Sequence, residues 1–240
     1  MSKLLLIESG TNVCSVAFAI DGKVVGLKES ADEKAHASQL TLFIDQLTKE
    51  TGVSISQLDA VVVSNGPGSY TGLRIGVSAA KGICYAAEKP LISISSLDSM
   101  VHGVSVNYKS LVEENGIDYY CPMIDARRME VYTALYDNAF NKIKEIEAQV
   151  IDETTFKDVL KDKKILFFGS GATKCKDTIN HHNAFYVNDF SPSAQFMIPL
   201  ALKAFANHTF EDIAYFEPYY LKDFVATVSQ KNLIPGLHKT

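Results

Sequence analysis

A glycine-rich stretch at residues 65–76 is the part of the sequence whose residue types and spacing could bind an anionic ligand. It reads Asn-Gly-Pro-Gly-Ser-Tyr-Thr-Gly-Leu-Arg-Ile-Gly and follows a short β-branched run. We therefore expect it at a strand-to-helix turn, where open α/β sheets place their ligands. Gly66 and Gly68 permit positive φ and close backbone approach, and Ser69 or Thr71 can cap the following helix. The combination predicts a ligand site or an interface.

Neither common phosphate-binding motif fits this stretch. A Walker loop ends in Gly-Lys-Ser/Thr, whereas Gly72 is followed by Leu73 and Arg74. The dinucleotide fingerprint needs its third glycine one residue earlier than Gly72. A tight turn with close helix packing therefore remains the alternative for each glycine taken alone.

Metal and nucleophilic chemistry find little support in the sequence. The histidines form no His-Glu-x-x-His motif and no pair at i, i+4 spacing, so we expect no metal site. The cysteines show no Cys-x-x-Cys spacing and are expected to be free buried thiols. Ser69, His36 and Asp125 could be drawn together as a triad, but their spacing does not require it. We expect no catalytic residues.

Composition narrows the class of protein further. A chain of 240 residues suits one large domain or two small ones. The net charge of −5, with no basic run longer than two residues, argues against a protein whose main task is to hold a phosphate backbone. The apolar run near residue 4 is too short for a signal peptide or a membrane span, so we expect a cytoplasmic protein with no membrane contact.

The elements that would position the glycine-rich stretch alternate between strands and helices. Asp21-Gly22 predicts a two-residue hairpin turn, and the apolar residues of 36–50 have helical spacing. The expected elements of the first half are strands at 3–9, 13–20 and 23–29, a helix at 36–50, a strand at 59–64, a helix at 71–87, a strand at 90–95 and a helix capped by Ser96.

The second half has the same order of elements. We expect strands at 119–124, 130–136 and 142–150, a helix at about 153–161, a strand at 164–168 ending in Gly169-Ser170-Gly171, a short helix, a strand at 185–187 and a helix from Pro192 to about His208. The sequence itself does not repeat. This order predicts an α/β fold of two similar lobes with a cleft between them, at 1–103 and 104–228, and a loosely ordered tail at 229–240.

The helix expected at 71–87 carries a stripe of small residues. Gly72, Gly76 and Ala80 recur every four residues and lie on one line along the helix. Leu73 and Val77 begin a second, apolar stripe beside it. A helix that is apolar on more than one face lies in a core or is covered by a partner, and we expect a second helix to pack on the small stripe.

The segment from Gly66 to Gly76 resembles the signature of the TsaB (YeaZ) family, bacterial proteins needed to make the threonylcarbamoyl-adenosine modification of tRNA. Weaker matches are Leu6-Ile7-Glu8-Ser9, Ile124-Asp125-Ala126-Arg127-Arg128 with Glu130-Val131-Tyr132, and Pro218-Tyr219-Tyr220-Leu221-Lys222. In motif order the resemblance extends to about Lys222. It implies the actin/Hsp70/sugar-kinase (ASKHA) superfold, which the order of elements also resembles.

The superfold implies a nucleotide site between one hairpin from each lobe. Its acidic positions correspond to Glu8 and Asp125, and the further candidates for contacts are Ser69, Thr71, Arg127, Gly169 and Gly171. Glu8 departs from the family's usual aspartate, and a displacement on the order of 1 Å costs catalysis heavily. We therefore expect no cofactor of its own, and at most weak nucleotide binding in the cleft or at a partner interface. A structural ion pair of Asp125 and Arg127 is the alternative.

The family resemblance also implies partners. The segment from His36 to Leu40 resembles the family's His-Ser-x-x-Leu helix start, and this helix with helix 71–87 implies the surface that binds TsaD, the catalytic subunit, or a second copy of the chain. The interface residues expected are His36, Leu40, Phe43, Gly72, Leu73, Gly76, Val77 and Ala80.

The resulting hypothesis is a non-catalytic subunit. It would bind TsaD and the ATPase TsaE, so that threonylcarbamoyl is transferred to adenosine 37 of tRNAs that read ANN codons, and it would meet the tRNA through the complex. The alternative is an enzyme of the same superfold that acts alone, either a phosphotransferase or a peptidase.

Overall fold

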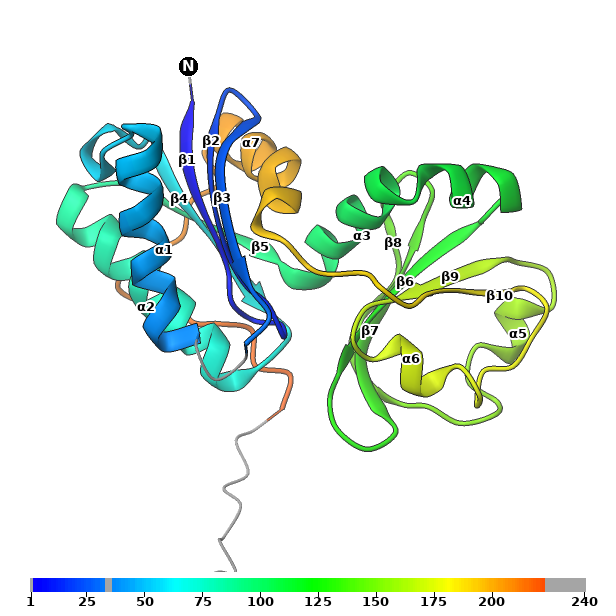
Figure 1. Ribbon diagram of the computed structural model, residues 1–240. Coiled ribbons are helices and arrows are strands. Elements are labelled where there is room, and N and C mark those ends of the chain that lie inside the picture. The colour runs from blue at the N-terminus through cyan, green and yellow to red at the C-terminus, as the bar shows by residue number, and fades with distance from the viewer. Residues whose placement is uncertain (1, 33–35, 223–240) are drawn as a thin grey trace, which may run out of the picture.

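The computed structural model describes residues 2–32 and 36–222. It consists of two α/β lobes that lie side by side (Figure 1). The expected tail at 229–240 lies outside the described residues. Within the described part, no helix is long and apolar enough to cross a membrane.

The first lobe begins with a three-stranded meander. Asp21 and Gly22 both have positive φ, 47° and 78°, as the predicted two-residue hairpin turn requires. The elements of this half are β1 (Lys3–Glu8), β2 (Cys14–Ile20), β3 (Lys23–Ser30), α1 (His36–Thr51), the 3₁₀ helix η2 (Ile55–Gln57), β4 (Ala60–Gly66), α2 (Tyr70–Ala87) and β5 (Leu91–Ser95).

The second half repeats the order with shorter helices. The first half ends with α3 (Ser96–Asn107). The elements of the second half are α4 (Lys109–Asn115), β6 (Tyr119–Asp125), β7 (Glu130–Asp137), β8 (Lys142–Val150), α5 (Lys157–Leu160), β9 (Ile165–Phe168), α6 (Ala172–Cys175), β10 (Ala184–Val187), the 3₁₀ helix η3 (Ala194–Met197) and α7 (Ile198–Ala206). The helix expected at about 153–161 is thus a single turn, since Phe156 before it has φ 63°. Ser95, not Ser96, caps α3: its hydroxyl accepts the Asp98 N–H at 3.3 Å.

Both sheets have the same topology. Their strand orders are β3-β2-β1-β4-β5 and β8-β7-β6-β9-β10. Counted along the chain, the first three strands of each sheet pair antiparallel. The fourth strand pairs in parallel with the first and with the fifth. The predicted α/β fold of two similar lobes with a repeated order of elements is confirmed.

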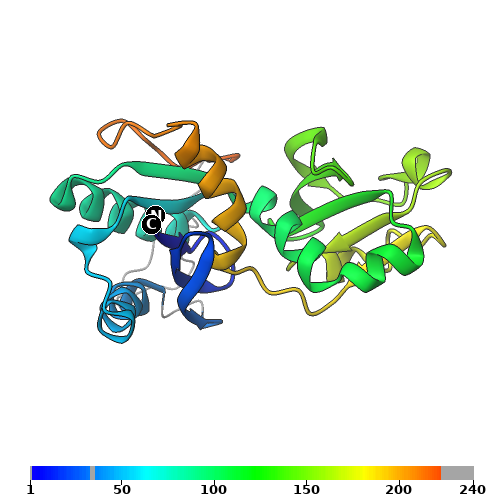
Figure 2. The same cartoon turned by 90° about the horizontal axis from the view of Figure 1, so that it is seen from above.

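The last helix of each half packs on the other lobe. Leu97, Met100 and Val104 of α3 are buried with β6 and β9 of the second sheet. Met197 and Ile198, at the junction of η3 and α7, are buried on the first sheet, on the face opposite α1 and α2. Both views keep α7 with the first lobe and α3 with the second (Figures 1 and 2). The expected division at 103/104 is therefore wrong, because each sheet needs a helix from the other half to cover one face.

Candidate functional site

The glycine-rich stretch packs against the turn that follows β1. A Cβ atom added at Gly68 would lie well under 3.0 Å from the Gly10 carbonyl oxygen, and one at Gly72 equally close to the Ser9 oxygen. The Ser69 N–H also donates to the Gly10 oxygen at 2.7 Å. These glycines therefore allow two segments of the same backbone to approach each other. They do not leave a cradle for an anion.

The small-residue stripe of α2 faces inward. A Cβ at Gly76 would collide with the Ser9 hydroxyl, which donates to the Gly72 oxygen at 2.9 Å. Ala80 is fully buried against the sheet. The expectation that this stripe is open to a second helix is wrong, because α2 uses it to approach β1. The apolar residues expected at the interface are likewise buried in their own lobe, namely Leu40, Phe43, Leu73 and Val77. The side chain of His36 lies outside the described part.

A second stripe of small residues lies on the outer face of α2. Ser78, Gly82 and Ala86 are exposed and also recur every four residues. A Cβ at Gly82 would meet nothing within 4 Å. Tyr85 stands beside them with 83% of its surface exposed. The sequence carries this signal, but the same spacing occurs at Gly72, Gly76 and Ala80, and only packing tells the two stripes apart.

Glu8 is sealed beneath the first turn. Its side chain is 1% exposed, and Oε1 accepts the Gly10 N–H at 2.8 Å. Burial raises the pKa of this carboxyl to about 7, against the lowering effect of hydrogen bonds from Gly10, Ser64 and Thr11. The carboxyl therefore supports the turn from the inside, and its oxygens are occupied by the chain itself.

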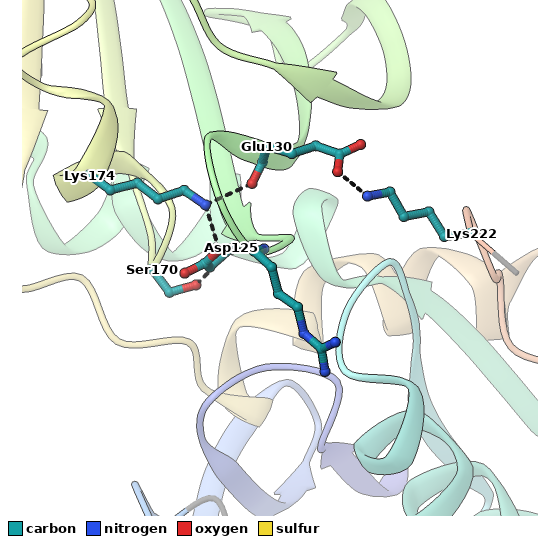
Figure 3. A network of polar contacts seen from close by, with 6 residues as sticks. Asp125, Glu130, Ser170, Lys174 and Lys222 are labelled. Atoms are coloured by element: carbon teal, nitrogen blue, oxygen red, sulfur yellow. Dashed lines mark hydrogen bonds and ion pairs between the residues drawn. The ribbon is translucent and has the colours of Figure 1, made fainter. Parts of the chain in front are cut away.

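Asp125 belongs to a polar network at the end of β6 (Figure 3). Its Oδ1 atom accepts the Lys174 ammonium at 2.5 Å and the Arg127 backbone N–H at 2.7 Å. The Lys174 ammonium also donates to the Glu130 carbonyl at 2.7 Å. Asp125 thus ends a strand, as expected, but its ion-pair partner is Lys174. The ion pair of Asp125 with Arg127, the alternative drawn from the sequence, is not formed.

Gly169 and Gly171 repeat in the second lobe what the glycine-rich stretch does in the first. A Cβ at Gly169 would lie 2.5 Å from the Met123 oxygen, and one at Gly171 would lie 2.7 Å from a Val131 methyl. Gly169 also has φ 97°. Both positions require glycine for packing inside the chain.

The segment that follows Phe216 closes the gap between the lobes. The Tyr219 N–H donates to the Asn65 oxygen at 2.8 Å, and the Tyr220 ring lies 5.0 Å from the Tyr70 ring. Lys222 then forms an ion pair with Glu130 of the second lobe (Figure 3). The cavity left here measures about 30 Å³, which is room for about two water molecules. In the sequence this segment is only a weak match to the family, and nothing in it predicted a position between the lobes.

The candidate nucleotide residues do not converge on this cavity. Of the segments that hold them, only the glycine-rich stretch reaches it, through Gly68, Tyr70 and Leu73. A larger cavity of about 250 Å³ lies elsewhere, between β5 and α7, and is lined by none of the candidates. Among the described residues, no three His, Cys, Asp or Glu side chains are grouped so that they could hold a metal ion.

Fold and site together define a two-lobed α/β protein whose two five-stranded sheets share one topology. A family model described as TsaD, tRNA N6-adenosine threonylcarbamoyltransferase, matches residues 29–230. The chain belongs to the family that this model describes and, within it, to the TsaB (YeaZ) proteins.

Three similar proteins illustrate this membership. The tRNA threonylcarbamoyladenosine biosynthesis protein TsaB of Escherichia coli (strain K12) is 29% identical over 231 residues, which are 93% of this chain and 96% of that protein. The structure of YeaZ from Pseudomonas aeruginosa matches with a TM-score of 0.78 at 22% identity, over 92% of this chain and 100% of that one. The tRNA N6-adenosine threonylcarbamoyltransferase of Clostridium kluyveri is 25% identical over 57% of this chain and 47% of that protein.

The burial of Glu8 predicts a pH dependence of stability. An unfolded chain ionises this carboxyl near its ordinary pKa of 4.5, whereas the folded chain keeps it protonated up to about pH 7. The folded state then binds more protons, so its stability falls between these two pH values, by about 3 kcal/mol in total. Glu8→Gln can keep the hydrogen bond from Gly10 and should remove this part of the dependence. Urea unfolding of both proteins at pH 5 and pH 8 measures it, and equal pH dependence in the two would contradict the assignment.

Proposed function

We propose that this chain is a non-catalytic subunit in the formation of threonylcarbamoyladenosine at position 37 of tRNAs that read ANN codons. It would bind a TsaD-type transferase, together with the ATPase TsaE, in the cytosol. The similarity to the Escherichia coli protein named for tRNA threonylcarbamoyladenosine biosynthesis supports the pathway. The observation that carries the role as a binding subunit is the exposed small-residue stripe of α2.

Gly82 is the centre of that stripe. Glycine in the middle of an exposed helix costs about 1 kcal/mol relative to alanine. Nothing in the described chain requires a glycine there, since an added Cβ would meet no atom within 4 Å. A requirement from outside the chain accounts for it: a second helix can approach closely only where side chains are small.

The partner's own fold supports the choice of a TsaD-type subunit. The family model of that transferase matches residues 29–230, a range that includes α1 and α2, and we infer that the transferase has counterparts of both helices. Two such helix pairs can meet about a pseudo-twofold axis with the same faces in contact. Leu42 of the neighbouring α1 is 48% exposed and adds apolar area. The same face would pair two copies when the transferase is absent.

The two acidic positions at which the superfold resemblance implies nucleotide contacts, Glu8 and Asp125, support a role without catalysis. Glu8 is occupied by the Gly10 N–H, and Asp125 by Lys174 and the Arg127 N–H. A carboxyl group so engaged must break its own contacts before it can hold a metal-bound phosphate. We therefore propose that any nucleotide binds the isolated chain weakly, either between the lobes or at the partner interface.

ATP turnover by the purified chain separates this proposal from an enzyme that acts alone. We expect no release of phosphate above that of a buffer blank when Mg²⁺ and ATP are supplied, because both acidic positions are engaged. Robust turnover that disappears in Asp125→Ala would overturn the non-catalytic assignment and favour the phosphotransferase alternative.

Two glycine substitutions in one helix test the interface. Gly82→Leu should leave the melting temperature unchanged or raise it, since the site is open and leucine favours helix. It should weaken binding to the TsaD-type subunit by roughly ten- to hundredfold, the usual effect of overpacking a close contact by about 1–3 kcal/mol.

Gly76→Leu is the matched control. It should prevent stable folding, because the added side chain would strike Ser9 inside the lobe. Calorimetry for binding and thermal unfolding for stability give both readouts. If the Gly82→Leu protein folds and binds the TsaD-type subunit with wild-type affinity, the proposed interface is contradicted.

A further inference from the structure

Tyrosines and cations from both lobes meet around the mouth of the small interlobe cavity. We name this the cleft-mouth surface, made of Tyr70, Arg74, Tyr132, Tyr219, Tyr220 and Lys222. The Arg74 guanidinium lies 5.2 Å from the Tyr70 ring, and that ring lies 5.0 Å from Tyr220. The Lys222 ammonium lies 6.0 Å from the Tyr132 ring and pairs with Glu130. One group of contacts therefore reaches α2 and the other reaches β7, and the segment from Tyr220 to Lys222 connects the two.

Two of the four tyrosines of this surface are exposed to solvent, whereas Tyr70 and Tyr132 are partly buried. Tyr219 and Tyr220 are 47% and 38% exposed. Tyr219 is held by its backbone N–H on the Asn65 oxygen, so its ring is not needed for that contact. Large rings that remain half in water offer free faces on which planar groups can stack.

The β6–β7 hairpin adds two arginines beside this surface. Arg127 and Arg128 follow Asp125 and precede Glu130, whose carboxylate reaches Lys222. Both are exposed, and within residues 2–32 and 36–222 neither has a carboxylate partner. Both have positive φ, 72° and 49°, a conformation that costs an L-residue roughly 1–2 kcal/mol. The Arg127 N–H bond to Asp125 helps to hold this tip in place.

The local charge is opposite to that of the chain. The cleft mouth and the hairpin hold four cations, namely Arg74, Lys222, Arg127 and Arg128, and Lys174 of α6 pairs with Asp125 beside them. The carboxylates identified near these cations are Asp125, Glu130 and Glu217. The whole chain carries a net charge of −5. A cationic region with exposed aromatic rings on an acidic protein points to an anionic ligand that carries planar groups.

We propose that the cleft-mouth surface and the hairpin arginines bind a single-stranded segment of RNA, namely of the tRNA that the complex modifies. This rests on the proposed function. RNA loops are recognised by stacking of unpaired bases on aromatic or arginine planes and by cationic contacts to phosphates. A cavity of about 30 Å³ is too small to enclose a nucleoside, so the surface suits bases stacked on its outside. The net charge of the whole chain does not reveal a local group of cations. For that reason the sequence predicted contact with tRNA only through the complex.

The test measures RNA binding by the isolated full chain. The probe is a fluorescein-labelled anticodon stem-loop RNA with an ANN-reading anticodon loop, titrated by fluorescence anisotropy from 50 to 200 mM salt. Arg127→Ala/Arg128→Ala should lower the affinity by on the order of tenfold and reduce the slope of log K against log salt by about 1.4, since each single-strand phosphate contact contributes about 0.7. Tyr219→Ala should lower the affinity by roughly five- to hundredfold, as loss of one stacked base does.

The matched control is Lys23→Ala/Lys157→Ala, which removes the same charge at exposed sites on β3 and α5. It should bind RNA like the wild type. No RNA binding at 50 mM salt, equal loss in the control, or unchanged affinity in the arginine variant would each overturn the proposal. So would binding of ATP, rather than RNA, that depends on these arginines.

The arginine variant should also bind the TsaD-type subunit like the wild type. Failure of the wild-type chain to bind that subunit would contradict the proposed function, whereas the RNA titration needs no partner and gives its answer separately.

Discussion

The close contact between the glycine-rich stretch and the turn after β1 determines the geometry of the first lobe. Gly68 and Gly72 lie so close to the backbone oxygens of Gly10 and Ser9 that a side chain at either position would collide with them. This contact seats α2 on the sheet and fixes which of its faces is buried. It also covers Glu8 and turns the stripe around Gly82 to the outside.

The second lobe meets the same constraint with Gly169, packed on the Met123 oxygen. Three contacts then join the lobes. Helix α3 of the first half packs on the second sheet, α7 of the second half packs on the first sheet, and Lys222 pairs with Glu130. The cavity that remains between the lobes measures only about 30 Å³. The chain's open features lie outside, on α2 and around the cleft mouth, where a protein or an RNA can reach them.

Much of the fold could be predicted from the sequence because it depends on local patterns. Three local patterns each predicted the element in which they occur: the β-branched run before Asn65 a strand, Asp21-Gly22 a hairpin turn, and the apolar spacing after His36 a helix. The exchange of α3 and α7 could not be predicted, since nothing in a helix's own sequence says which sheet it covers. The inward stripe of α2 was mistaken for an interface for the same reason: two stripes share one spacing, and only the distance to β1 separates them.

Oxidative footprinting of the chain with and without the TsaD-type subunit tests whether the outer face of α2 is the binding surface. Tyr85 stands on that face and is 83% exposed, while Phe140 of the second lobe is 37% exposed and serves as the internal reference. We expect hydroxyl-radical oxidation of Tyr85 to fall sharply when the subunit binds and oxidation of Phe140 to stay the same. Unchanged oxidation of Tyr85 in a fully formed complex would contradict this expectation.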